Sequence, residues 1–394
     1  MSLNSALSWE QRKLGDVVKE ITRNDPESEA PIMMITANNG FIEQSERYAF
    51  NNAGESLKKY ILLKKGELAY NHGASKLRPY GSCFALTTAE NARIPFVYHC
   101  FSAENQNAEF MSIELNGAEI ENQLRKIVSS GARMDGLLNI SFDEYTSVSV
   151  LLPGTEEQDC IADFFRQLDN LITLHQRKYD KLTNVKKSML EKMFPKNGSN
   201  VPEIRFKGFT EAWEQRKLGE VGKARSGVGF PDTEQGGTIG VPFFKVSDMN
   251  SDGNENEMTV ANNYVTAEQI AAHRWSPIEE LPAIFFAKVG AAVMLNRKRL
   301  CRFPFLLDNN TMAYSLSSTE WDADFAKALF ETIDLTSLVQ VGALPSYNAG
   351  DIEAMAISMP SLSEQGQIGE FFAALDDLIT LHQRELEKLK NIKK

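Results

Sequence analysis

The longest regular hydrophobic pattern in the chain runs from Thr155 to Phe194. Apolar side chains recur there every three or four residues, which is the spacing of one face of a helix. No proline interrupts the stretch, and at ~1.5 Å per residue its roughly 38 residues would form a helix about 57 Å long. A seven-residue series inside it favours pairing with another long helix. That series is Ile161, Leu168, His175, Leu182 and Met189.

The same sequence pattern is repeated near the C-terminus, so a second long helix is expected there. The shared pattern is Phe-Phe-x-x-Leu-Asp-x-Leu-Ile-Thr-Leu-His-Gln-Arg, beginning at Phe164 and at Phe371. If the two helices pair antiparallel about a pseudo-twofold axis, the heptad positions meet in defined pairs. The expected pairs are His175 with His382, Leu168 with Leu389, and Leu182 with Leu375.

A second repeat lies at the start of each half of the chain. The phrase Trp-Glu-Gln-Arg-Lys-Leu-Gly occurs at Trp9 and again at Trp213. The chain therefore reads as a tandem repeat of a globular module followed by a long helix. We expect a mixed α/β (α+β) protein in which two globular domains are joined by two long, antiparallel, coiled-coil helices. The expected divisions are 1–154 for the first domain, 155–195 for its helix, 196–208 for a linker, 209–362 for the second domain and 363–394 for a second, shorter helix.

In the first module, Leu68 to Asn71 reads as a strand, and a loop rich in glycine and polar residues follows it. Cations in such a loop suit phosphates, and amide, imidazole and guanidinium groups suit base edges. The alternative is a solvated surface loop. The candidate DNA-binding residues are Asn71, His72, Ser75, Lys76 and Arg78.

In the second module, the corresponding strand runs from Ala283 to Lys288 and leads into a basic stretch. Five cations and no carboxylate lie between Lys288 and Leu307. This predicts a local basic patch for DNA in an otherwise acidic protein, although a solvated charged turn is the alternative. The candidate residues are Lys288, Asn296, Arg297, Lys298, Arg299 and Arg302.

A glycine-led loop precedes the last strand of each module. In the first copy it carries Arg133, and in the second it carries Ser346, Tyr347 and Asn348. These side chains either reach a DNA groove or cap the strand that follows. We include them among the candidate DNA contacts.

Composition narrows the class of protein without deciding its function. The formal net charge of −11 excludes a uniformly basic nucleic-acid binder, but an average over the whole surface does not exclude a local DNA site. The four cysteines are widely spaced, which suits reduced thiols in the cytoplasm and offers no zinc site. No stretch looks like a signal peptide or a membrane span, so no membrane partner is expected.

Catalytic motifs are missing from the sequence. It contains no phosphate-binding loop, no nucleophile elbow and no His-Glu-x-x-His metal motif. His175 and His382 fall on the apolar stripe of the long helices, where we interpret them as packed core residues. The sequence therefore favours a binding protein over an enzyme.

These features resemble the DNA specificity subunits of type I restriction-modification systems. The resemblance rests on the Trp-Glu-Gln-Arg-Lys-Leu-Gly phrase, on Pro153 and Pro360 with the Glu-Gln that follows each, and on the repeated helix text. It implies two target recognition domains that read a bipartite double-stranded DNA site, with the helices fixing the spacer. It also implies modification (methyltransferase) and restriction (translocase-nuclease) subunits as partners. S-adenosylmethionine, ATP and Mg would then be needed only on those partners, with no cofactor on this chain.

A protein-protein interaction scaffold remains the alternative function. In that reading the helices join two protein-binding modules and the cations are solvated. Salt dependence separates the two hypotheses, because neutralising phosphates makes affinity fall steeply with salt.

Overall fold

The computed structural model describes residues 9–37, 40–47, 54–128, 137–196, 198–316, 319–339 and 345–393. The chain forms two compact units, Met1–Asn170 and Leu171–Lys394. Their boundary lies inside the long helix α4 (Thr155–Lys192) rather than at its start. The start of α4 belongs to the first unit because Ala162 is buried in the core of the first module. No helix in the described ranges is both long and apolar enough to cross a membrane.

The first unit is built on a four-stranded antiparallel sheet in the order β2-β9-β6-β7. Alternate side chains of β6 enter two different cores, with Leu68 and Tyr70 on one face and Ala69 on the other. A strand buried on both faces reads as a continuous apolar run, as Leu68-Ala69-Tyr70 does. The elements are β2 (Val18–Glu20), β3 (Met33–Thr36), β4 (Gly40–Glu43), β5 (Ile61–Lys64), β6 (Leu68–Asn71), β7 (Ser82–Ala85), β8 (Asn91–Ile94), β9 (His99–Ala103), α1 (Ala108–Leu115), α2 (Ala118–Ile127) and α3 (Phe142–Thr146).

The second unit repeats this sheet with the order β12-β18-β15-β16. Ile284 and Phe286 of β15 face the core that includes the long helices, and Phe285 faces a second core beside β13. The sheet topology is therefore the same in both units although their sequences differ. The elements are α5 (Leu218–Val221), β12 (Lys223–Ser226), β13 (Val241–Phe244), β14 (Tyr264–Val265), α6 (Ala267–His273), β15 (Ala283–Ala287), β16 (Lys298–Cys301), β17 (Leu306–Leu307), β18 (Thr311–Ser315), α7 (Ala323–Thr332) and α8 (Ala349–Glu353).

The repeated Trp-Glu-Gln-Arg-Lys phrase forms a strand that closes each module. β1 (Glu10–Lys13) pairs antiparallel with β10 (Ser149–Leu152), which directly precedes α4. β11 (Glu214–Lys217) pairs in the same way with β19 (Ala356–Met359), which precedes α9 (Leu362–Lys393). Each module is thus tied together at the point where its long helix begins.

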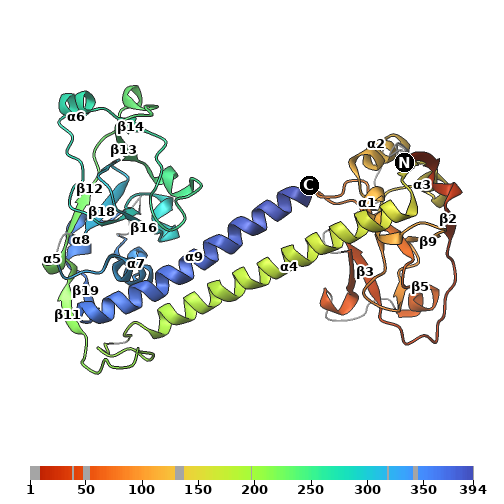
Figure 1. Ribbon diagram of the computed structural model, residues 1–394, viewed down its shortest axis with the longest axis horizontal. Coiled ribbons are helices and arrows are strands. Elements are labelled where there is room, and N and C mark those ends of the chain that lie inside the picture. Colours follow the sequence, from red (N-terminus) through yellow and green to blue (C-terminus); the bar gives the residue numbers. More distant parts are fainter. Residues whose placement is uncertain are drawn as a thin grey trace, which may run out of the picture. The chain divides into compact units, whose positions relative to one another are not determined.

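Within the second unit, the later part of α4 runs antiparallel to α9 (Figure 1). His175 Nδ1 lies 3.1 Å from His382 Nδ1, the pair that the heptad register placed together. Burial and the neighbouring His175 lower the pKa of His382. Leu182 packs against a core that contains Leu375. Leu168 lies in the other unit, so its pairing with Leu389 stays a prediction.

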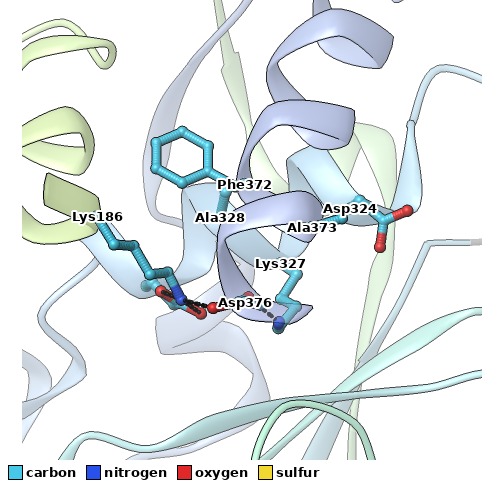
Figure 2. A pocket seen from close by; sticks show the side chains of 8 residues that line it. Lys186, Asp324, Lys327, Ala328, Phe372, Ala373 and Asp376 are labelled. Carbon is cyan, nitrogen blue, oxygen red and sulfur yellow. Dashed lines mark hydrogen bonds and ion pairs between the residues drawn. The ribbon is translucent and has the colours of Figure 1, made fainter. Parts of the chain in front are cut away.

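A buried ion-pair cluster joins α4, α7 and α9 in the second unit (Figure 2). Lys186 Nζ lies 2.6 Å from Asp376 Oδ1 and 2.6 Å from Glu331 Oε2, and Lys327 pairs with the other oxygen of Asp376. Burial lowers the pKa of Lys186, but the two carboxylates raise it by more. The cavity here is only about 10 Å³, far below the size of a ligand site. The cluster therefore attaches the second module to its helices.

Candidate nucleic-acid interface

In the second unit the structure brings together the two loops that the sequence singled out separately, and in the first unit it joins the loop after β6 to Leu137, because residues 129–136 lie outside the described ranges. In the first unit Gly73 forms a β-bridge with Leu137, and in the second Val289 forms one with Ser346. Gly73 and Val289 each lie two residues after the end of an inner strand of the four-stranded sheet, β6 in the first unit and β15 in the second. We call residues 71–81 with 137–138 the first rim, and residues 288–297 with 345–348 the second rim.

Two candidate residues of the first rim serve to hold it in place. Asn71 Nδ2 donates to the Ile35 carbonyl at 3.1 Å, and its Oδ1 accepts from Gly73 N at 2.9 Å. His72 is buried, with Nδ1 2.9 Å from the Leu138 carbonyl oxygen. The expectation that His72 reads a base edge is wrong for this structure, because its ring faces the protein interior.

The tip of the first rim is exposed around Lys76. Ser75 Oγ accepts from Arg78 N at 3.0 Å and closes the turn, while the Arg78 guanidinium donates to the Asn116 carbonyl at 2.7 Å. Gly81 has φ +84°, and a Cβ there would lie 2.6 Å from the Asn71 carbonyl oxygen, so glycine is needed. Lys76 is thus the cation best placed to meet a phosphate in the first rim.

In the second rim, Lys288 and Arg297 remain at the surface. Lys288 is half-buried at the end of β15, and its backbone N donates to the Asn310 carbonyl at 2.9 Å. The Arg297 guanidinium donates to Asn250 Oδ1 at 2.5 Å, a neutral partner that leaves its charge available. Asn348 is exposed and caps α8, accepting from Asp351 N at 3.1 Å.

Several other residues of the second rim are structural. The Tyr347 side chain is buried and its hydroxyl donates to the Ala287 carbonyl at 2.5 Å. Asn296 adopts φ +51° and bonds the backbone of Ile333 and Leu335, at 3.2 and 3.0 Å. Both side chains are engaged by backbone groups of the protein, so the structure does not support them as DNA contacts.

The basic patch expected from Lys288 to Leu307 does not form as such. Lys298 is buried with Nζ 2.5 Å from the Ile333 carbonyl oxygen, and burial lowers its pKa to about 8. Arg299 Nε donates to the Asn254 carbonyl at 2.6 Å, and burial lowers its pKa also. Arg302 pairs with Glu257 and Asp324 at 3.1 and 2.6 Å. The sequence pattern suggested that these cations were available for DNA, because the groups that pair with them lie far away along the chain.

One further group beside the second rim was missed by sequence reasoning. Asp308, which follows β17, is buried, and its burial raises its pKa. Lys245 lies close enough to lower it and also donates to Gln235 Oε1 at 3.0 Å. The polar run Asp308-Asn309-Asn310 between two buried strands was the available signal.

The described ranges hold no metal-binding group, and Arg133 lies outside them. No cluster of three or more His, Cys, Asp or Glu side chains is placed to hold an ion among those residues. The rims carry solvent-accessible cations beside amide and hydroxyl groups, on short loops that hydrogen bonds hold in place. That set suits phosphate contact and base-edge readout.

Comparisons with known proteins point to one family. Residues 210–391 match the family model described as the type I restriction modification DNA specificity domain. The chain is 23% identical over 297 residues to the type I restriction enzyme MjaVIII specificity subunit of Methanocaldococcus jannaschii, covering 68% of this chain and 64% of that protein. The second half of the chain therefore matches the type I DNA specificity domain, and the chain is similar to type I specificity subunits.

Further specificity subunits are similar to this chain. The putative MjaX specificity subunit of the same organism is 25% identical over 276 residues, covering 65% of this chain and 59% of that one. This chain thus spans about three fifths of the length of these relatives. The crystal structure of the type I S subunit from M. genitalium has TM-score 0.60 and 13% identity, covering 100% of this chain and 96% of that one. A structure from work on assembly and conformational transition of the type I R-M system has TM-score 0.53 and 14% identity, covering 100% and 97%.

Proposed function

We propose that the chain is the DNA-recognition subunit of a type I restriction-modification complex and reads a bipartite target. Each globular module reads one half-site through its rim, and the antiparallel helices set the spacer between the halves. The observation that carries this proposal is the repetition of one sheet order and one loop-to-loop bridge in both units, with different side chains on each rim. A shared frame with distinct loops is what two related but different half-sites require.

The chain directs partner subunits and is not itself an enzyme. Modification subunits methylate the target and restriction subunits cut the DNA, so S-adenosylmethionine, ATP and Mg belong to those partners. The complex works in the cytoplasm, where thiols stay reduced, in accord with four free cysteines.

Readout divides between phosphates and bases within each rim. Lys76 in the first rim and Lys288 and Arg297 in the second neutralise phosphates and set the position on the duplex. Ser75 and Asn348 are exposed on the same loops, where their hydroxyl and amide can address base edges. Cations fix where the module docks, and the polar groups beside them supply selectivity.

Affinity measured against salt tests the function and separates it from the scaffold alternative. The logarithm of the association constant for duplex DNA should fall linearly with the logarithm of salt concentration, at about 0.9 per neutralised phosphate. Binding to DNA that is weak and independent of salt would favour the scaffold. The acidic net charge of −11 makes this a demanding test, because only a local basic surface can produce the slope.

A further inference from the structure

The two units carry the same hydrogen-bonded motif at the start of their long helices. Asn107 N donates to Gln158 Oε1 at 2.9 Å, and Asp322 N donates to Gln365 Oε1 at 3.0 Å. Each glutamine amide also donates to the carbonyl of the proline five residues earlier, at 2.9 and 3.1 Å. The neighbouring glutamates, Glu157 and Glu364, are therefore structurally equivalent.

In the second unit an arginine forms an ion pair with this glutamate. Arg205 Nε and Nη2 donate to the two oxygens of Glu364 at 2.7 and 2.7 Å, and Glu364 is 1% exposed. The nearby Trp213 is 2% exposed, with Phe194 against its ring at a centroid distance of 5.9 Å. Phe206, next to Arg205, packs edge-on against Phe371 of the long helix. The covering side chains are Phe194, Arg205 and Phe206, which lie within 13 positions of one another in the sequence.

In the first unit the equivalent aromatic side chains are exposed, and the glutamate has no arginine partner among the described residues. Glu157 Oε1 accepts from Trp9 Nε1 at 3.2 Å, but Glu157 Oε2 is buried without a hydrogen-bond partner. Trp9 is 41% exposed and Phe164, the equivalent of Phe371, is 54% exposed. Within the described part of the first unit, no side chain takes the place that Arg205 holds in the second. A buried carboxylate oxygen left unpaired is costly, so this site favours a donor.

We propose that Trp9, Glu157 and Phe164, the first-unit socket, form a docking site for a polypeptide segment that presents an arginine beside aromatic side chains. The second unit shows the chemistry of the occupant, because the same socket there holds Arg205 with Phe194 and Phe206. A guanidinium matches a carboxylate through two parallel hydrogen bonds, which a lysine does not reproduce. Arginine binding would engage both oxygens of Glu157 and release the Trp9 indole, as in the second unit. This interaction surface is separate from DNA readout.

The test uses a labelled peptide with the sequence of residues 188–208 titrated against the full chain. Saturable binding is expected, and Arg205→Ala in the peptide should weaken it by roughly 10- to 100-fold. Glu157→Gln in the protein should weaken it similarly, whereas Glu156→Gln, one residue away and exposed, should have no effect. Combining the arginine and Glu157 changes should cost little more than either alone, since both remove one interaction.

Hydrogen exchange locates the bound peptide. Amides at the start of α4 should exchange more slowly with peptide present, while those at the start of α9 should not change. Thermal unfolding of the Glu157→Gln variant serves as the check that it is folded. The proposal is overturned if the peptide does not bind, if binding ignores both the arginine and Glu157, or if protection appears only at the start of α9.

Discussion

At the residue scale, the rims leave few cations able to meet DNA, and these make a sharp prediction. Lys76→Ala and Lys288→Ala should each weaken DNA binding and reduce the salt slope by about 0.9, because each removes one phosphate contact. Lys65→Ala is the matched control, since Lys65 is exposed in the turn at the opposite end of β6 and pairs with Glu90 at 2.8 Å. Fluorescence anisotropy at several salt concentrations measures both quantities. A slope unchanged by Lys76→Ala or Lys288→Ala would remove that residue from the interface.

Lys298 differs from these cations because its charge is buried, and this predicts a pH dependence of stability. Its pKa of about 8 in the folded protein lies below the ordinary lysine value. The unfolded chain therefore holds this proton more tightly, and the free energy of unfolding should rise as pH increases from about 8 to about 10.5, by roughly 3 kcal/mol at most. The stabilisation is lost as pH falls through the folded pKa.

Lys298→Met isolates that contribution. Urea unfolding at about pH 7.5 and about pH 10 should show a smaller difference in the variant than in the original chain, because the titrating group is gone. An equal difference in both proteins would mean that Lys298 is not the buried titrating group.

The basic stretch from Lys288 to Leu307 shows which functional residues the sequence could predict and which it could not. The sequence shows only that several cations lie close together along the chain. In the structure, Lys298, Arg299 and Arg302 bind Ile333, Asn254 and Glu257, respectively. Those partners lie 35 to 45 residues away, so only the fold brings them together. The rim as a location was predictable, but which of its side chains face solvent was not.

At the element scale, the ion-pair cluster on α9 should be essential to the attachment of the second module. Asp376→Asn removes the charge shared by Lys186 and Lys327 and should destabilise the chain by about 3–5 kcal/mol, since it leaves buried charge uncompensated. Asp377→Asn, exposed on the same helix, should change stability by less than about 0.5 kcal/mol. Denaturant unfolding compares the two, and equal effects would contradict the structural role of the cluster.

Long elements were predictable because their hydrophobic periodicity is strong. The pattern predicted helices beginning at Thr155 and near Leu362, and α4 and α9 begin there. Repeated text also placed His175 opposite His382. Asp376 was overlooked because a charge beside an apolar stripe reads as solvent-facing until the packing of α7 is known. Sheet order depends on pairings far apart in sequence, so the shared order of the two units required the structure.

At the scale of the whole molecule, the helices should act as a ruler for the DNA spacer. Seven residues inserted after Leu174 and another seven after Leu381 keep the apolar seam in phase and lengthen the pair by about 10 Å. Along B-DNA at ~3.4 Å per base step this corresponds to roughly three base pairs. The half-sites should keep their sequences while the preferred gap grows, or bipartite binding should be lost with single-half binding retained. A changed half-site with an unchanged gap would defeat the ruler hypothesis.

The central claim is that one chain reads two separate half-sites through two modules. Sequencing of methylated DNA after modification by the complex assembled with its methyltransferase subunits tests it most directly. The account predicts one methylated motif made of two different short sequences separated by a gap of fixed length and unspecified bases. It also predicts that Lys288→Ala together with Arg297→Ala relaxes or loses one of those sequences and leaves the other intact. A single continuous motif, or the simultaneous loss of both halves in that variant while it remains folded, would contradict the account.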